Sequence, residues 1–162
     1  METIKNMPDN ARIWVYQSNK LLPDAEVTEI KKAGLNFIAD WSAHGASLKA
    51  SFDILYNRFI IISVDEQQAM ASGCGIDKSV KFVKELEQQF NLNLFDRLQV
   101  AYRKGKGIVT CHISEFEKLA DQDIINESTI VFNNMVTTIA AFNKEWEVPL
   151  KQSWHSRVLV NK

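Results

Sequence analysis

Alternation of apolar and polar residues is clearest between residues 46 and 56, and it predicts a β-strand with one buried face. Residues 59–64 are apolar almost throughout, which is typical of a central strand covered on both faces. Asn57-Arg58 can form a tight turn between them, because Asn tolerates a positive φ. The two runs are therefore expected to form an antiparallel hairpin. The apolar side of the first strand consists of Leu48, Ala50, Phe52, Ile54 and Tyr56, and its polar side of Ser47, Lys49, Ser51 and Asp53.

Apolar residues spaced by three and four positions predict two long helices in the first part of the chain. The first begins at Pro23-Asp24, where a proline and acidic residues favour a helix start, and it continues to about Trp41. The second is expected from Ile76 to Phe90. The same criteria predict strands at 12–16, 97–103, 108–112 and 128–132, a helix from the capping box Ser114–Glu117, and a last helix over 135–146.

Residues 12–103 follow the order β-α-β-β-α-β, which is that of the ferredoxin-like split βαβ fold. We expect an antiparallel sheet in the spatial order 4-1-3-2 with both helices on one face, because crossover connections are right-handed. Residues 104–162 are expected to extend this core, with a fifth strand that follows the turn Lys104–Gly107 and pairs with the fourth. The 162 residues are thus expected to form a single α+β domain.

Composition and charge narrow the function classes. Hydrophobic residues make up 46% and charged residues 24%, which excludes a largely disordered chain. The formal charge of −1 gives no electrostatic reason to expect a nucleic-acid partner. The N-terminal residues 1–10 contain no apolar run, and the longest apolar stretch, Phe59–Ile62, is too short for a membrane helix. With only two cysteines, we expect a protein of the reducing cytoplasm that has no membrane partner.

The predicted topology brings three connections together at one end of the sheet. They are the connection that carries His44, the connection that carries Cys74, and the hairpin that carries Arg103, Lys104 and Lys106. Loops on a rigid scaffold are the usual place for binding and catalysis. We therefore expect a functional site at this end.

The segment Ser72–Asp77 ends a long connection and opens a helix, which makes it the main candidate for a ligand site. Its glycines permit a close approach of the backbone, and the N–H groups of a helix start bind anions. A structural alternative stays open, in which the glycines serve a turn, Cys74 is buried and Asp77 caps the helix. The expected ligand is a small anion, held by Ser72, Gly73, Gly75 and Asp77 with Arg103 or Lys106 as the cation.

Cys74 also supports a catalytic interpretation. The helix dipole makes a thiol at a helix start acidic, and His44 would act as its base. In the alternative interpretation, His44 interacts with the C-terminal end of the preceding helix. Cys111 lies on a strand that runs away from this end, so it is not expected to join the pair. A third hypothesis is an interaction protein whose sheet face or tail binds another chain.

No motif indicates a metal or a cofactor. Cys111 and His112 are neighbours on a predicted strand, so their side chains point to opposite faces and cannot easily bind one zinc ion. The sequence contains no G-x-x-x-x-G-K-[ST] and no G-x-G-x-x-G, which excludes a P-loop nucleotide site. We therefore expect neither a metal nor a cofactor.

The tail that follows Pro149 has neither helical nor strand spacing. It contains Trp154, a large apolar side chain that is unfavourable in water. We therefore expect the tail to be irregular and to dock on the domain through Trp154. Nothing in the sequence fixes the oligomeric state.

Several short segments carry a resemblance to a known group of proteins. They are Trp41–Gly45, Val64–Glu66, Ser72–Asp77, Leu94–Arg97, Val131–Asn134 and Ser153–His155. On these segments, and over nearly the whole length, the chain resembles a family of small uncharacterised bacterial proteins that often carry the label "ABC transporter ATPase". The missing P-loop contradicts that label. The resemblance implies a bacterial, cytoplasmic protein, and because it brings no established activity it assigns no catalytic residue.

Overall fold

The computed structural model describes residues 3–43, 49–66 and 73–159, which form two compact units of mixed α+β structure. Unit 1 comprises Met1–Phe95 and Thr137–Ala140, and unit 2 comprises Asp96–Val136 and Ala141–Lys162. The first segment of unit 1 thus ends at Phe95, whereas the predicted core extends to residue 103. That the two units fold as one domain stays a prediction.

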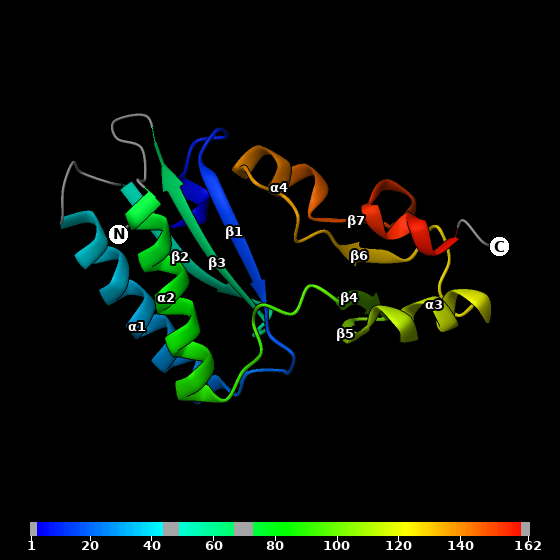
Figure 1. The fold of residues 1–162 in the computed structure, drawn as a ribbon. Coiled ribbons are helices and arrows are strands. Elements are labelled where there is room, and N and C mark those ends of the chain that lie inside the picture. Colours follow the sequence, from blue (N-terminus) through cyan, green and yellow to red (C-terminus); the bar gives the residue numbers. More distant parts are fainter. Residues whose placement is uncertain (1–2, 44–48, 67–72, 160–162) are drawn as a thin grey trace. The chain divides into compact units, whose positions relative to one another are not determined.

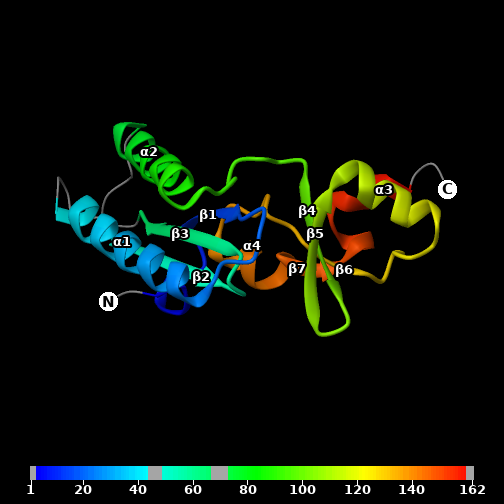
Figure 2. The ribbon, with the colours of Figure 1, turned by 90° about the horizontal axis from the view of Figure 1, so that it is seen from below.

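Unit 1 is a three-stranded antiparallel sheet with two long helices (Figures 1 and 2). The spatial order of its strands is β1-β3-β2. The elements are η1 (Ile4–Asn6), β1 (Arg12–Gln17), α1 (Asp24–Ala43), β2 (Lys49–Leu55), β3 (Phe59–Asp65) and α2 (Gly73–Phe90). All of these match elements predicted from the pattern except the short η1.

The hairpin of β2 and β3 is confirmed, with Phe52 opposite Ile62 in an antiparallel ladder. Its turn is centred one residue earlier than predicted, because Tyr56 and Asn57 both have a φ of 53°. Two successive residues with positive φ match the right-handed twist of the strands they connect. The predicted burial of β3 on both faces is also confirmed, since every residue from Phe59 to Val64 is buried.

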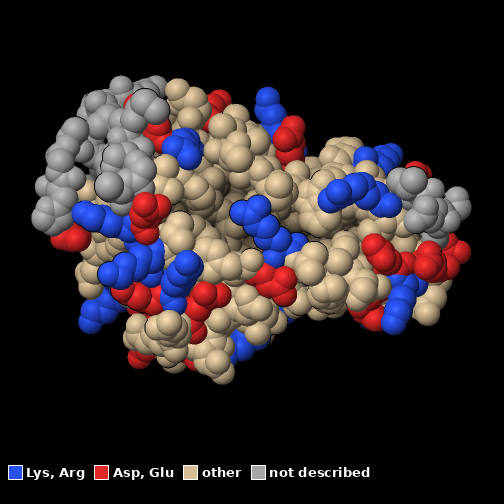
Figure 3. Space-filling model, in the orientation of Figure 1, with Lys and Arg blue, Asp and Glu red and all other residues tan. Residues whose placement is uncertain are grey.

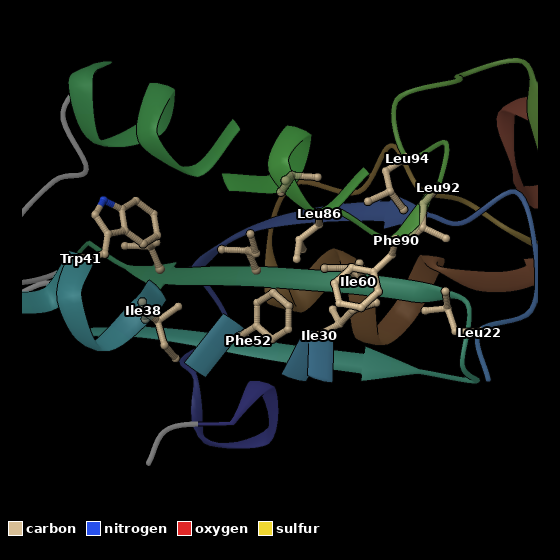
Figure 4. Packing of buried hydrophobic residues seen from close by; sticks show 14 residues of the cluster. Leu22, Ile30, Ile38, Trp41, Phe52, Ile60, Leu86, Phe90, Leu92 and Leu94 are labelled. Atoms are coloured by element: carbon tan, nitrogen blue, oxygen red, sulfur yellow. The ribbon is translucent and has the colours of Figure 1, made fainter. Parts of the chain in front are cut away.

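The core of unit 1 lies between the two helices and one face of the sheet (Figure 4). Every second residue of β2 and β3 points into it, which explains the alternation seen in the sequence. Gly34 lets α1 approach the sheet closely, because a Cβ at this position would lie 2.2 Å from Cδ1 of Phe52. The buried members are Leu22, Ile30, Ile38, Trp41, Ala50, Phe52, Ile60, Ile62, Val64, Val83, Leu86, Phe90, Leu92 and Leu94.

The predicted sheet order 4-1-3-2 is corrected. The fourth strand, β4 (Gln99–Lys104), belongs to a different sheet. The segment 137–139 pairs with the free edge of β1 instead: the Ile13 N–H donates to the Thr137 carbonyl at 3.1 Å, and the Ile139 N–H donates to the Ala11 carbonyl at 3.0 Å. The physical reason is that β4 forms a local hairpin, which costs less chain entropy to close than a return to β1.

Unit 2 contains a four-stranded antiparallel sheet in the order β5-β4-β6-β7. The predicted hairpin is confirmed, with Lys104 opposite Gly107 and Gly105 at a φ of 60° in the turn. Leu98 lies within the strand predicted at 97–103, but it precedes β4 and is exposed. The further elements are β5 (Gly107–His112), α3 (Ile113–Asp121), β6 (Ile130–Phe132), β7 (Glu147–Pro149), η2 (Leu150–Gln152) and η3 (Trp154–Leu159). The helix α4 (Ile139–Glu145) begins in unit 1 and continues in unit 2.

Two helix boundaries in the second half of the chain differ from the prediction. The prediction that Ser114–Glu117 forms a capping box is wrong. The helix α3 is capped by the His112 side chain, whose Nδ1 accepts a hydrogen bond from the Ser114 N–H at 3.1 Å. The last helix begins at Ile139 rather than at residue 135, because the residues just before it are not helical and Thr138 forms a β-bridge with Arg12 of β1. Local sequence cannot reveal that pairing.

The prediction that the tail docks is confirmed within unit 2. Leu150 and His155 are buried, and Trp154 packs against the apolar cluster that contains Phe116. The tail is not irregular, since it forms two 3₁₀ helices, η2 and η3.

Candidate functional site

The helix α2 begins at Gly73, three residues before the predicted start at Ile76. Gly73, Cys74 and Gly75 therefore form the first turn of the helix. Asp77 lies beyond this turn and is exposed, so the interpretation of Asp77 as the helix cap is wrong. Ser72, His44 and the side chain of Cys74 lie outside the described residues.

The ends of several elements meet at this end of unit 1. In Figure 1, α1 ends at Ala43 and β3 ends at Asp65 at the same end of the sheet at which α2 begins. This arrangement is the one expected if His44 and Cys74 lie on neighbouring connections. Their proximity to each other stays a prediction.

The two cations expected at the site belong to unit 2. The Arg103 Nε donates to a carboxylate oxygen of Glu147, and the guanidinium lies 5.6 Å from the centroid of the Phe132 ring. Lys106 is exposed in the β4–β5 turn. Arg103 thus has a structural role within unit 2, and its participation in a ligand site with the start of α2 stays a prediction.

Other charged groups lie at the same end of unit 1. Arg12, at the start of β1, donates to the Glu66 carboxylate at 3.0 Å, and its guanidinium lies 4.8 Å from the centroid of the Trp14 ring. The first turn of α2 contains no acidic side chain. The positive end of the helix dipole is therefore not neutralised by a carboxylate of that turn.

Trp41 lies at this end, in a position where the sequence predicts only the end of the first helix. It lies in the last turn of α1 and is 4% exposed, yet its Nε1 has no hydrogen-bond partner in the described part of the chain. A buried indole N–H normally has an acceptor. In the sequence, the one sign of this donor is the position of Trp41 at the end of the helix that precedes the connection with His44.

Unit 2 contains a buried polar cluster that the sequence did not indicate. The Ser153 hydroxyl and Nδ1 of His155 are 2.6 Å apart, and both side chains are buried. The Trp154 ring stacks on His155 with centroids 3.9 Å apart. Burial, together with the positive charge of Arg157, lowers the pKa of His155 to about 4. A neutral imidazole that no substrate can reach stabilises the tail and is no catalytic base.

Cys111 and His112 lie in different environments. Cys111 is packed against the unit 2 core, and burial followed by the charge of Glu115 raises the pKa of its thiol. His112 is exposed and its Nδ1 is engaged at the start of α3. Within the described ranges, no group of three His, Cys, Asp or Glu side chains is placed to bind a metal ion.

Large apolar side chains are exposed at the opposite end of unit 1. Leu21 and Tyr56 are among them, and Phe95, also partly exposed, makes an edge-to-face contact with Tyr16 at 5.4 Å between centroids. Scattered exposed apolar residues are common on soluble domains. The hypothesis of an interaction protein therefore stays a prediction.

Charge and hydropathy of the surface add little to these candidates. On the face seen in Figure 3, Lys and Arg side chains are interspersed with Asp and Glu. No helix in the described part of the chain is long and apolar enough to cross a membrane.

Comparisons with protein families, with curated proteins and with solved structures give no match. The resemblance carried by the six segments therefore stays a prediction.

Proposed function

We propose that unit 1 binds a small anionic ligand at the start of α2. The observation that carries this proposal is the position of the helix start, which makes Gly73-Cys74-Gly75 the first turn. The first N–H groups of a helix have no partner within the helix and point outward along its axis. Together with the helix dipole, they attract negative charge.

The composition of this turn supports the proposal. Two of its three residues are glycines, which place no side chain between an oxyanion and the backbone. No acidic side chain of the turn competes for the N–H groups. Each charge-assisted hydrogen bond to an anion contributes about 1.5–3 kcal/mol.

Inorganic phosphate is the probe that tests this proposal. In ¹⁵N-labelled protein at constant ionic strength, phosphate is expected to shift the backbone amide signals of residues 73–76 in a saturable way. Gly75→Glu places a carboxylate in the first turn and should abolish the effect. Gln88→Glu adds the same charge near the far end of the helix and is the matched control. Amide signals that do not move on phosphate addition would contradict the proposal.

A second function uses the same turn. Cys74 lies in the first turn of α2, where the dipole lowers the pKa of a thiol. We infer that a thiol enzyme with Cys74 as nucleophile and His44 as base is the alternative to a binding module, and the last experiment of the Discussion separates the two.

We also infer that unit 1 represents a ferredoxin-like arrangement whose fourth strand is replaced. The order β1-β3-β2 equals three of the four expected positions, and both helices pack on the same face. The segment 137–139 occupies the edge of β1 that the fourth strand would take. Backbone hydrogen exchange would test this, since it should protect the amide of Ile139.

A further inference from the structure

We infer that the open edge of β5 pairs with β5 of a second copy of this chain, so that two copies of unit 2 form a two-fold symmetric dimer through one continuous antiparallel sheet. The inference is independent of the anion site in unit 1. It depends on which backbone groups of β5 have no partner, and on how charge is distributed at the two ends of this strand.

The backbone of β5 has one bonded side and one open side. The strand lies at the end of its sheet, and β4 is the only strand paired with it in the described part of the chain. Lys104 and Gly107 close a two-residue turn, and in such a hairpin this pair exchanges hydrogen bonds whereas the next pair does not. The Ile113 N–H, further along the same ladder, donates to the Leu98 carbonyl at 2.7 Å, as this alternation requires.

Ile108 and Thr110 therefore direct their N–H and C=O groups away from β4. They occupy the positions of the ladder that make no hydrogen bond across the strand pair. Within residues 3–43, 49–66 and 73–159, no other backbone or side-chain group bonds to them. A row of such unpaired groups is a template for another strand.

The other sheet edges differ from the edge of β5. The outer edge of β1 is bonded to segment 137–139. The strand β7 has three residues and ends in Pro149, and β2 carries the charged residues Lys49 and Asp53. Short length, proline and charged residues are means by which proteins keep an edge strand from pairing. In contrast, β5 has six residues, and none of them is Pro, Lys, Arg, Asp or Glu.

Charge at the two ends of β5 selects a second copy of the chain as the occupant. The turn before the strand carries Lys106, and the first turn of α3 after the strand carries Glu115, and both residues are exposed. Besides burial, the charge of Glu115 raises the pKa of Cys111, so this carboxylate lies near the far end of β5. Neither Lys106 nor Glu115 has an ion-pair partner among the described residues. In an antiparallel pair of identical strands, the lysine end of each copy meets the glutamate end of the other.

The register of the pair follows from the open backbone groups. With Ile108 opposite Thr110 of the second copy, these two residues exchange hydrogen bonds, and the two-fold axis passes between the two Val109 residues. Lys106 then lies opposite His112 of the second copy, at the start of α3. Both open edges are used in this contact, so the assembly closes at two copies. The edge of β7 is too short to extend the sheet further.

Analytical ultracentrifugation of the full chain measures the assembly. One pair of strands is a small contact, so we expect a monomer–dimer equilibrium with a dissociation constant between about 1 μM and 1 mM. Hydrogen exchange then locates the contact. The amides of Ile108 and Thr110 should be protected at high protein concentration and exchange rapidly on dilution. The amides of Val109 and Cys111 bond to β4, so they are internal controls whose protection should not depend on concentration.

Charge substitutions give the second measurement. Lys106→Glu turns two attractive contacts into repulsive ones, so the dissociation constant should rise about tenfold. Lys106→Glu combined with Glu115→Lys exchanges the two charges and should restore most of the affinity. Lys81→Glu makes the same change at an exposed lysine of α2 and is the matched control.

Thr110→Pro removes one outward N–H and leaves the ladder with β4 intact, because proline is tolerated where the N–H of an edge strand faces solvent. This variant should be monomeric, and circular dichroism establishes that it is folded. The charge variants test the same contact without a change in the backbone.

The outcomes decide between this contact and others. A chain that stays monomeric up to about 1 mM contradicts the inference. A dimer in which Ile108 and Thr110 exchange as fast as in the monomer uses another surface, and this result contradicts it as well. If Lys81→Glu weakens the dimer as much as Lys106→Glu does, the effect is one of net charge, and the assignment to β5 is wrong. Protection of Ile108 and Thr110 that depends on concentration, together with recovery in the double variant, supports the inference.

Discussion

Different kinds of contact stabilise unit 1 and unit 2, each within itself. In unit 1 two long helices lie on a sheet, and the contacts between them are apolar, as in the stack of Phe37 on Phe82. In unit 2 two of the strands have only three residues, and side-chain pairs such as Arg103–Glu147 and Ser153–His155 join elements or fix the tail. Unit 1 should therefore be sensitive to the shape of its core, and unit 2 to the loss of its tail and of its polar pairs.

The largest effect is expected from Gly34→Ala, which tests the shape of the unit 1 core. The new Cβ would lie 2.2 Å from Cδ1 of the buried Phe52 ring, so the helix and the sheet must separate. We expect the free energy of unfolding to fall by about 3 kcal/mol, although alanine is the better helix former. Equilibrium denaturation with urea measures the change.

Gly107→Ala is the matched control for this substitution. A Cβ at Gly107 would have the Lys104 carbonyl oxygen 3.7 Å away as its nearest neighbour, which is ordinary contact. The expected change in the free energy of unfolding is within about 0.5 kcal/mol. A Gly34→Ala variant as stable as the parent would show that the close approach of α1 to β2 does not hold the unit together.

The second effect concerns the tail of unit 2. Deletion of residues 150–162 removes the buried Leu150 and the Trp154 ring from the unit 2 core. Burial of an indole contributes about 2–3 kcal/mol, so the thermal midpoint should fall by several degrees. A differential scanning calorimeter measures the midpoint, and an unchanged value would mean that the tail contributes nothing to the stability of the protein.

The third effect is a dependence of the free energy of unfolding on pH, which arises from His155 in unit 2. Its pKa is about 4 in the folded protein, whereas an unperturbed histidine has about 6.5. As the pH falls below 6.5, the unfolded chain binds a proton that the folded chain does not, so stability is lost down to about pH 4 and not further. Between pH 7 and pH 5 the free energy of unfolding should fall by about 2 kcal/mol from this group.

A pair of variants isolates this contribution. His155→Gln should remove most of the slope of stability against pH between 6.5 and 4. His112→Asn, at an exposed histidine whose cap an asparagine can replace, should leave the slope as it is. Urea denaturation at several pH values gives the slopes, and equal slopes for both variants would contradict the assignment to His155.

The sequence predicts those strands whose periodicity of apolar residues reflects burial, but it does not predict which strands pair. Ala50 and Phe52 of β2 are buried, as the alternation predicts, although Ser51 of the predicted polar side is buried too. The apolar run of β3 is buried throughout, and this strand forms where predicted. The pattern of Val100 and Tyr102 predicts a strand but not its neighbour, so β4 was assigned to the wrong sheet. Segment 137–139 is too short to show any period.

The helix that opens at the candidate site was predicted close to its place, whereas the surroundings of single side chains were not. Gly73 and Gly75 mark a connection that enters a helix, and α2 begins at Gly73, three residues before the predicted start. Trp41 could not be recognised, because a tryptophan at helical spacing looks like a core residue whether or not its N–H has a partner. The low pKa of His155 could not be predicted from the sequence either, because it arises from burial in the folded unit and from the nearby charge of Arg157.

The smallest expected effect sharpens the comparison between the two cysteines, one in each unit. Cys74 lies in the first turn of α2, and we expect the helix dipole to lower the pKa of its thiol. Burial raises the pKa of Cys111 in unit 2. The rate of alkylation against pH, measured on Cys111→Ser, should give a midpoint below about 8 for Cys74. On Cys74→Ser, the remaining Cys111 should titrate above a free thiol.

The variant His44→Ala tests whether an acidic Cys74 thiol belongs to a thiol enzyme or to an anion site. If the two residues form an activated pair, loss of the imidazole should raise the alkylation midpoint of Cys74, because the thiolate loses a positively charged neighbour. If the dipole alone acidifies the thiol, the midpoint should stay below about 8 in the variant, which favours the anion site over the thiol enzyme. A midpoint near 8.5 in both proteins would remove the enzyme hypothesis, and a thiol that reacts only in denaturant would support a buried, structural Cys74.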